Sequence, residues 1–366
     1  EDQLTGLGLQ IETTSEGWNV SIPSFRFDLA IEVDLIEELG RLYGYENLPN
    51  TRPQGTVLSA DISEETLATH RLQSLLVDRG YQEAITYSFV DPKIQQHLVQ
   101  QGETAIELAN PISADLSIMR ISLWPGLVQA LVYNLNRQHT RVQLFEVGRV
   151  FKGTTDNVEQ HRHIGGVLCG SRYPEQWAEK EKPVDFYDAK ADVEALLNLG
   201  GKKDIKFVAE QHDALHPGQS ARIVQDGLPI GWLGALHPRL EKTLGFTGKV
   251  YVFELALVPV LAATIPEFSP LSKFPAIRRD IALILDEEIS INKIDDCLKA
   301  IKSDILNEIQ LFDVYSGDGV ELGKKSVAVA FTVQHDERTL TDEDMNALMQ
   351  MITEQLEKEV GATIRS

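Results

Sequence analysis

Residues 24–49 read SFRFDLAIEVDLIEELGRLYGYENLP and carry the change from an extended to a helical pattern near the start of the chain. Apolar residues recur at helical spacing through the second half of this stretch, which predicts an amphipathic helix. Five carboxylates fall within eleven residues of it: Asp28, Glu32, Asp34, Glu37 and Glu38. The last three are spaced i, i+3 and i+4, so they share one helix face, on which like charges repel.

These carboxylates are compatible with two explanations. In the first they form a solvated acidic face, with Arg41 as the nearest counter-charge. In the second they hold Mg²⁺, which takes oxygen ligands in octahedral geometry and commonly combines carboxylates with water. The helical periodicity alone favours the solvated face, so the choice depends on the rest of the chain.

The composition indicates a globular protein without a general affinity for polyanions. The 366 residues are 43% hydrophobic and 24% charged, and the net charge of −21 excludes whole-surface attraction to nucleic acid or to an anionic membrane. The two cysteines, Cys169 and Cys297, cannot build a disulfide framework, which indicates a reducing cytoplasm. The longest apolar run, residues 250–265, contains Glu254 and is too short to span a bilayer, so no membrane role is expected.

Two proline-rich segments divide the chain and predict domains at residues 1–50, 51–270 and 271–366. The middle region contains hairpin-linked strands and three amphipathic helices, which predicts an antiparallel sheet with helices on one face. Its first helix is expected to begin after Ser63 as the N-cap. The last region follows the order βαββαβ of a ferredoxin-like domain, so the fold class is α+β.

Several segments in sequence order resemble the large (beta) subunit of bacterial phenylalanyl-tRNA synthetase. They include VSIPSFRFDLAIEVDLIEELGRLYGYENLP, ANPISADLSIMRISLWPGLVQALVYNLNRQ, LFEVGRVF, IGWLGALHPRL and SKFPAIRRDIALIL. The resemblance covers essentially the whole chain. It implies a B5 domain that begins part-way, a core like that of class II synthetases, and a ferredoxin-fold anticodon-binding domain. The oligonucleotide-binding-fold and editing domains that precede B5 in this family are not expected here.

The resemblance also changes which of the two explanations of the acidic stretch is favoured. The family's magnesium ligands are the Asp after Arg-Phe and the acids six, nine and ten residues further on. In this sequence those positions are Asp28, Asp34, Glu37 and Glu38. The resemblance therefore favours a Mg²⁺ site at the contact with the small (alpha) subunit, with a structural role and no chemistry of its own.

The core is expected to be a catalytically silent copy that packs against the alpha subunit. A working class II site uses arginines to stabilise the charge of the transition state. LFEVGRVF offers Arg149 without the Arg-x-Glu of a motif 2, and GWLGALHPRL places Arg239 after His-Pro in a turn. We therefore predict no catalytic residue on this chain. The spacing of five histidines matches no zinc pattern: His161, His163, His212, His216 and His237.

The C-terminal region offers local positive charge on an acidic background. Residues 272–366 hold 11 basic and 19 acidic residues, a net charge of −8. In KSVAVAFTV the large apolar residues alternate with small ones, so one sheet face has room for RNA, but the residues alone favour a plain ferredoxin-like packing module. The aromatic stacking pair of an RRM is absent. From the resemblance to the anticodon-binding domain, the expected tRNA contacts are Lys273, Arg278, Arg279, Lys324, Lys325, Arg338 and Arg365.

The resemblance implies a non-catalytic portion of phenylalanine–tRNA ligase. It would support ATP-dependent attachment of phenylalanine to tRNA(Phe) by binding the alpha subunit and tRNA, in a cytoplasmic α2β2 tetramer. Two alternatives stay open from the residues. One is a stand-alone RNA-binding or assembly module. The other is a Mg²⁺-dependent phosphoryl-transfer protein built on the four carboxylates, for which Arg26 and Arg41 are the local basic residues.

Overall fold

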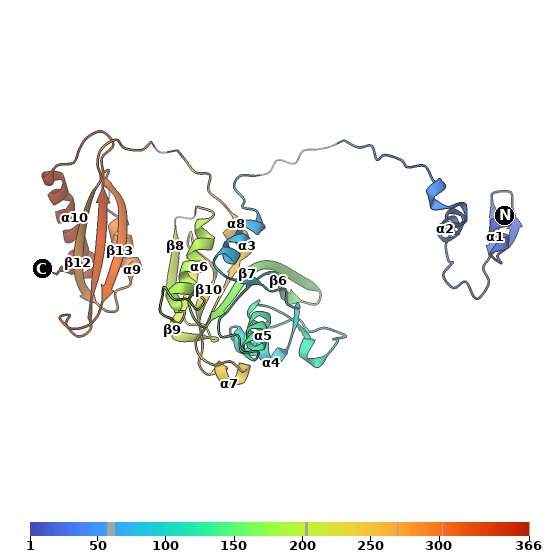
Figure 1. Ribbon diagram of the computed structural model, residues 1–366, viewed down its shortest axis with the longest axis horizontal. Helices are drawn as coiled ribbons and strands as arrows, with labels where there is room; N and C mark the ends of the chain where they lie inside the picture. The colour runs from blue at the N-terminus through green and yellow to red at the C-terminus, as the bar shows by residue number, and fades with distance from the viewer. Residues whose placement is uncertain (57–62, 202–203, 269, 302, 366) are drawn as a thin grey trace. The chain divides into compact units, whose positions relative to one another are not determined.

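The computed structural model describes residues 1–366 except 57–62, 202–203, 269, 302 and 366 (Figure 1). The chain divides into two compact units, Glu1–Ile62 and Ser63–Ser366. The first unit contains α1 (Asp2–Gly6), the strand pair β1 (Gln10–Thr13) and β2 (Trp18–Ser21), and α2 (Glu32–Tyr43). A short 3₁₀ helix follows at Tyr45–Asn47. The predicted helix is confirmed, whereas the strand before it ends at Ser21 and leaves residues 22–31 without strand structure.

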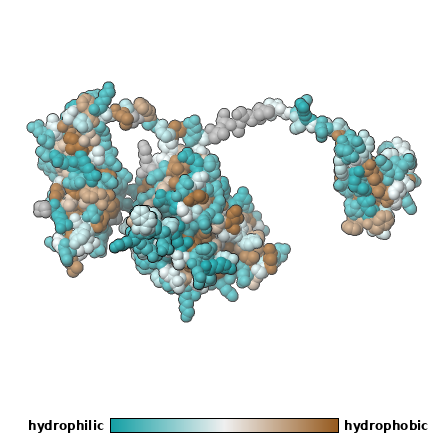
Figure 2. Space-filling model, viewed as in Figure 1, coloured by the Kyte–Doolittle hydropathy of each residue, from teal (hydrophilic) through white to brown (hydrophobic). Residues whose placement is uncertain are grey.

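Leucines form the core of the first unit. Leu4, Leu9 and Leu29 are buried, and Leu35 and Leu39 of α2 pack against them. The other apolar side of α2 is left at the surface, where Val33 and Ile36 are more than half exposed. Figure 2 shows hydrophobic residues at the surface of this unit. The helix is therefore apolar on more of its circumference than its own unit covers.

A seven-stranded sheet with the order β3-β6-β7-β11-β10-β9-β8 is the centre of the second unit. Every neighbouring pair is antiparallel except β3 and β6. The bounds are β3 Gln82–Glu83, β6 Val142–Thr154, β7 Asn157–Cys169, β8 Ile205–Ala209, β9 Leu215–Gln225, β10 Leu228–Leu236 and β11 Val250–Ala256. A separate strand pair joins β4 (Phe89–Val90) to β5 (Ile118–Met119).

Helices cover both faces of this sheet, so the expectation of helices on one face is wrong. One core contains α3 (Thr69–Asp78), α6 (Phe186–Asn198) and α8 (Leu257–Leu261). The other contains α4 (Pro92–Leu98), α5 (Trp124–Leu135) and α7 (Leu240–Leu244). The physical reason lies in strands such as β11, whose residues Val250 to Leu255 are all buried, because a strand buried on both faces needs cover on both.

The start of the first helix is also corrected. Helix α3 begins at Thr69 and not after Ser63. The intervening backbone bonds elsewhere, since Leu67 donates its N–H to the Leu261 carbonyl at 2.7 Å and Thr66 forms a bridge with Ala262. A segment whose backbone groups pair with another strand-like segment cannot also enter a helix.

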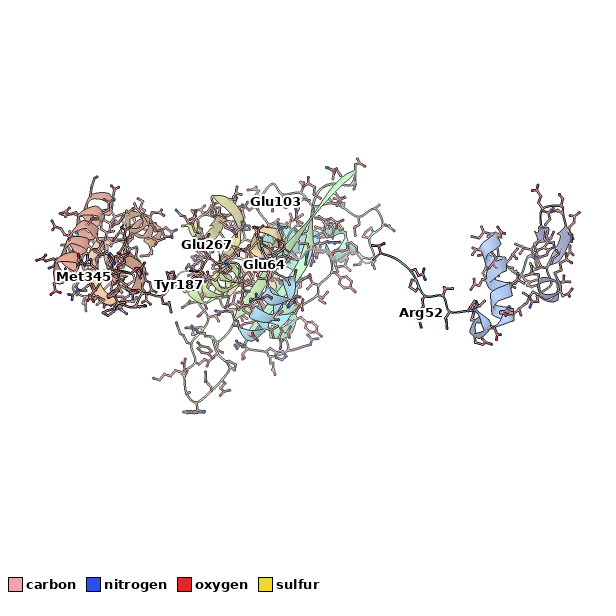
Figure 3. All side chains as sticks on the ribbon, turned by 90° about the horizontal axis from the view of Figure 1, so that it is seen from above. Arg52, Glu64, Glu103, Tyr187, Glu267 and Met345 are labelled. Atoms are coloured by element: carbon pink, nitrogen blue, oxygen red, sulfur yellow. The ribbon has the colours of Figure 1, made fainter. Side chains whose placement is uncertain are left out.

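The C-terminal region confirms the predicted βαββαβ order. Its elements are β12 (Ile277–Asp286), α9 (Ile291–Lys299), β13 (Leu306–Tyr315), β14 (Lys324–Val333), α10 (Asp342–Val360) and β15 (Thr363–Ile364). The sheet order is β13-β14-β12-β15, with antiparallel pairs throughout. Val327, Val329 and Phe331 are fully or almost fully buried under the helices, with Met345 of α10 (Figure 3) in the same core. None of the described helices is both long and apolar enough to cross a membrane.

Candidate functional site

The four acids of the first unit take different partners. Asp34 lies in the first turn of α2, where its Oδ2 accepts hydrogen bonds from the backbone N–H of Ala30 at 2.7 Å and of Ile31 at 2.9 Å. These bonds lower the pKa of the Asp34 carboxyl. Asp34 therefore acts as a cap that satisfies N–H groups ahead of the helix. Glu37 lies exposed on the same helix.

Arg26 links the other two acids. Its Nη2 lies 2.7 Å from Asp28 Oδ2 and 3.2 Å from Glu38 Oε1. Arg41 also pairs with Glu38, with its Nη2 2.7 Å from Oε2. The hydrogen bond from Arg26 lowers the pKa of Asp28, and those from Arg41 and Arg26 lower the pKa of Glu38. Both carboxyls are therefore ionised at neutral pH, and a cation already lies between them.

The donor chemistry of this cluster fits a hard divalent cation, because four carboxylates supply the oxygen ligands that Mg²⁺ takes. The positions of these carboxylates in the structure, however, do not match this chemistry. Within the described residues, no three or more His, Cys, Asp or Glu side chains are grouped so as to hold a metal ion. Only Asp28 and Glu38 flank a common cation, and that cation is Arg26. Arg26 and Arg41, the local basic residues, are both paired with acids of this cluster.

The central sheet carries a row of side chains on the face below α5. Pairing register places Glu146 opposite Gly165, Gly165 opposite Glu254, Glu254 opposite Trp232, and Trp232 opposite Arg222. Directly paired residues of antiparallel strands point to the same face. The row therefore crosses β6, β7, β11, β10 and β9 and presents acids at two points and an arginine at its end.

Glu254 is buried and fully engaged. Its Oε2 accepts hydrogen bonds from Ser122 Oγ at 2.6 Å and from the Leu123 N–H at 3.0 Å, and its Oε1 lies 2.6 Å from His163 Nδ1. Ser122 and Leu123 directly precede α5. A carboxylate at this position is stabilised by the positive end of the helix dipole. Glu254 thus fixes the start of α5 to the sheet.

Glu146 forms a second buried set. Arg120 Nη1 donates to Glu146 Oε1 at 2.7 Å, and the side chains are only 3% and 4% exposed. Thr86 Oγ1 donates to the other carboxylate oxygen at 2.7 Å, and Arg120 Nε donates to the Arg149 carbonyl at 2.8 Å. Every group of this set has a partner within the chain, so it carries a structural role.

Arg149 and Arg239, the arginines of the two segments compared with class II motifs, lie away from this row of side chains. Arg149 is exposed, and alternation along β6 turns it to the face opposite Glu146. Arg239 donates to the Asp213 carbonyl at 2.6 Å beside α7. Sequence reasoning overlooked Glu146 and Glu254 as site residues. The available signal was a single acid inside an otherwise apolar strand, which indicates a buried and therefore paired charge.

The structure separates the seven predicted tRNA contacts into two groups. Ile277 pairs with Val333 at one end of β12, and Asp286 pairs with Lys324 at the other. The ten residues of β12 span roughly 30 Å at about 3.3 Å per residue. The first group lies at or beyond the Ile277 end and contains Lys273, Arg278, Arg279 and Arg338. The second group contains Lys324 and Lys325 at the other end, and Arg365, whose backbone lies opposite Ala282 in the middle of β12 and whose guanidinium approaches Gly319 in the turn before β14.

Most of these cations already have an acceptor in the chain. Arg338 binds Asp344 with two bonds of 2.6 and 2.9 Å, Arg278 lies 2.8 Å from Asp280, and Lys324 lies 2.8 Å from Glu321. Lys325 donates to two backbone carbonyls. The acid pairs are at the surface, where an ion pair contributes only about 0–1 kcal/mol. A phosphate group could therefore replace the acid at little cost.

Models of three protein families match the chain in sequence order. The tRNA synthetase B5 domain matches residues 1–45, and the phenylalanyl tRNA synthetase beta chain CLM domain matches residues 48–257. The ferredoxin-fold anticodon binding domain matches residues 272–365. Together these matches leave few residues unassigned, and their order is the one expected from the sequence motifs.

Curated relatives match along the full chain. The phenylalanine–tRNA ligase beta subunit of Nitrosococcus oceani is 51% identical over 366 residues, which are 100% of this chain and 46% of the relative. That of Pseudomonas savastanoi pv. phaseolicola is 49% identical, and that of Methylococcus capsulatus is 46% identical, with the same coverage. The chain thus spans about half the length of the curated relatives it matches.

Among solved structures, a pyrrolysyl tRNA synthetase of Desulfitobacterium hafniense is similar with a TM-score of 0.40 and 13% identity, over 52% of this chain and 64% of that one. A likeness this distant carries no conclusion about function. The family model over residues 48–257 and the relatives that are 46–51% identical along this chain show the family. The chain belongs to the phenylalanyl-tRNA synthetase beta chain family.

Proposed function

We propose that this chain is a non-catalytic part of a phenylalanine–tRNA ligase. It supports the ATP-dependent attachment of phenylalanine to tRNA(Phe) by binding the alpha subunit and tRNA, within an α2β2 assembly in the cytoplasm. The observation that carries the proposal is the similarity, along the whole of this chain, to relatives named as beta subunits of this ligase. The anticodon-binding match at residues 272–365 supports the contact with tRNA.

The geometry of the central sheet supports a non-catalytic role. Stabilising a phosphoryl transition state needs preorganised cations directed at the developing charge. Arg120 is held by Glu146 in a fully buried pair, and neither Arg149 nor Arg239 lines the hollow above the sheet. Arg222 does line it, but it is a single arginine over the Trp232 ring and not the set of cations that a phosphoryl site needs. The chemistry is therefore assigned to the alpha subunit.

An exposed apolar surface on α2 supports a partner contact in the first unit. Val33, Ile36 and Tyr43 are 56%, 58% and 56% exposed, and with Leu48 they line a shallow apolar hollow. Contiguous apolar surface of this kind marks interaction sites in soluble proteins. We assign it to the contact with the alpha subunit.

We assign Mg²⁺ to the adjacent carboxylates Asp28, Asp34, Glu37 and Glu38. When bound, the ion would neutralise the acidic cluster at the subunit contact. Two of the acids already flank a cation, and Arg26 is the group that the ion would have to displace. Arg26→Met should therefore strengthen Mg²⁺ binding measured by calorimetry, and Glu38→Gln should weaken it. The matched control is Glu46→Gln, which changes an acid outside the cluster, and equal affinity in all variants would contradict the assignment.

The tRNA contacts are assigned to the two cationic groups of the C-terminal sheet. Charge removal at a phosphate contact weakens binding for every sequence and reduces the salt dependence of the affinity. Arg278→Gln and Arg365→Gln test one group each. The control is Lys249→Gln, which removes an exposed charge outside the C-terminal region. Loss of tRNA affinity in one variant only would locate the contact, and no loss in either variant would contradict it.

The proposal as a whole is tested by phenylalanine-dependent exchange of pyrophosphate with ATP. The exchange is measured with this chain alone, with the alpha subunit alone, and with the two after co-purification. Activity in the mixture only is the expected result. Activity of the chain alone would contradict the non-catalytic role, and an inactive but stable complex would contradict the supporting role.

A further inference from the structure

A pocket of about 290 Å³ lies over the row of side chains on the central sheet. Its floor comes from β7, β9, β10 and β11, and its walls come from the start of α5 and from the segment after α4 that contains Glu103 (Figure 3). Leu98, Val99 and Ile121 form a buried apolar side. This volume is at the small end of the range for ligand pockets, about 300–1,000 Å³. It has room for a single ring with a small substituent.

Aromatic rings form the second side of the pocket. The His212 ring lies between Trp124 and Trp232, with centroid distances of 5.2 and 4.8 Å and edge-to-face geometry. His212 Nδ1 accepts a hydrogen bond from the Ala214 N–H at 3.1 Å, so the ring proton is on Nε2. Burial lowers the pKa of His212 to about 4, which keeps the ring neutral at pH 7. His212 therefore adds an N–H donor to an aromatic surface.

The charged groups of the pocket are unequally satisfied. Glu254 is engaged by Ser122, Leu123 and His163, so little of its hydrogen-bonding capacity is left. Arg222 is half-buried with its guanidinium 4.5 Å from the Trp232 ring centroid. Among the described residues, no carboxylate or carbonyl accepts a hydrogen bond from that guanidinium. A half-buried cation with five unused donors is stabilised by an anion, which binds in a planar, bidentate manner.

We propose that this pocket binds a small aromatic anion, with its ring against Trp232 and the apolar side and its acidic group on Arg222. Three features agree on this chemistry: the volume, the aromatic surface and the unused guanidinium. The inference goes beyond the role in the ligase. It rests only on groups of the central sheet and of the segments that pack on it, so its test is independent of subunit and tRNA binding.

The test uses benzoate as the probe and benzamide as its neutral counterpart of nearly equal shape. The chain has four tryptophans, which give four indole N–H signals in a nitrogen-15 NMR spectrum. Trp124 and Trp232 line the pocket, whereas Trp18 and Trp177 are 51% and 98% exposed elsewhere. Benzoate should shift the two pocket signals saturably and leave the other two in place. Benzamide should bind at least tenfold more weakly.

Two variants locate the charge that binds the probe. Arg222→Gln should weaken benzoate at least tenfold and leave benzamide unchanged, and Arg222→Lys should restore part of the benzoate affinity. Arg149→Gln removes an exposed arginine on the other face of the same sheet and should change neither. Well-dispersed tryptophan signals in each variant show that it is folded.

The proposal is overturned if benzoate leaves the Trp124 and Trp232 signals in place. It is also overturned if all four tryptophans shift together without saturation, which is binding at high concentration only. Equal affinity for benzoate and benzamide would show that Arg222 does not bind the acidic group, and so would an unchanged benzoate affinity in Arg222→Gln. Either result overturns the proposal. Should that variant lose its fold, Arg222→Lys still decides, because a planar guanidinium site must bind benzoate more tightly than the lysine does.

Discussion

Removing the Glu146 carboxylate should destabilise the central sheet strongly. Its partner Arg120 is 3% exposed, and in Glu146→Ala the guanidinium keeps only the Thr86 hydroxyl and the Arg149 carbonyl as acceptors. Removing one member of a buried ion pair costs about 3–5 kcal/mol, because the remaining charge stays buried without its partner. The free energy of unfolding of the central sheet should fall by that amount.

The change is measured by thermal and guanidinium denaturation followed by tryptophan fluorescence. Trp124 and Trp232 pack against the core on the same sheet face, so they report on this part of the chain. At about 2–4 °C per kcal/mol for a domain of this size, Tm should fall by roughly 6–20 °C. The control is Glu103→Ala, which removes an exposed partner of Lys152 at 3.4 Å and should cost less than about 1 kcal/mol.

A double variant separates the charge from the packing. Arg120→Met combined with Glu146→Leu leaves no unpaired buried ion, so it should regain most of the stability that Glu146→Ala loses. If Glu146→Ala is no more destabilising than the Glu103→Ala control, the pair is not buried as the structure has it. If the double variant is less stable than the single one, the loss comes from packing and the electrostatic reasoning is wrong.

Three further outcomes are expected. Burial lowers the pKa of His212 to about 4, below the roughly 6.5 of a free imidazole, so stability is full above pH 6.5 and falls by about 3 kcal/mol on the way to pH 4. Denaturation of His212→Phe as a function of pH should lack this slope. Hydrogen bonds from Arg338 lower the pKa of Asp344, so its contribution is present above about pH 4 and is lost on further acidification; in Asp344→Asn the Tm should respond less to acid. A Cβ at Gly148 would overlap the buried guanidinium of Arg120, so Gly148→Ala should lower the free energy of unfolding by about 1–3 kcal/mol, measured by denaturation. Gly55→Ala, whose surroundings are open, should change it little.

The C-terminal fold could be predicted because its elements carry local signals. Helix α10 follows its N-cap Thr341, whose Oγ1 accepts the Asp344 N–H at 3.3 Å, and it ends before Gly361 at φ +66°. Both are helix-end signals that can be seen in the sequence. Strand β14 alternates large and small residues, so its buried face was also predictable.

The acidic stretch shows a limit of local pattern. Spacing on the helix placed Asp34, Glu37 and Glu38 on one face, yet their surroundings differ. Glu38 is bound by Arg26, twelve residues earlier, through the turn that follows β2. Helical periodicity predicts which residues are neighbours within α2. It does not predict which side chains of the preceding loop contact the helix. The counter-charge Arg41 could be predicted from the sequence, whereas the pairing of Asp28 and Glu38 with Arg26 followed only from the structure.

The buried acids show why the central site could not be predicted from the sequence. A lone Glu in an apolar strand indicates a buried, paired charge, but its partner is set by strand register. Glu254 lies between Gly165 and Trp232 because β11 is aligned with β7 and β10 in one register. A slip of one residue would turn Glu254 into the opposite apolar core, where it has no partner. The two glutamates therefore select the register as well as depend on it, and the same alignment places Arg222 over Trp232 at the end of the row.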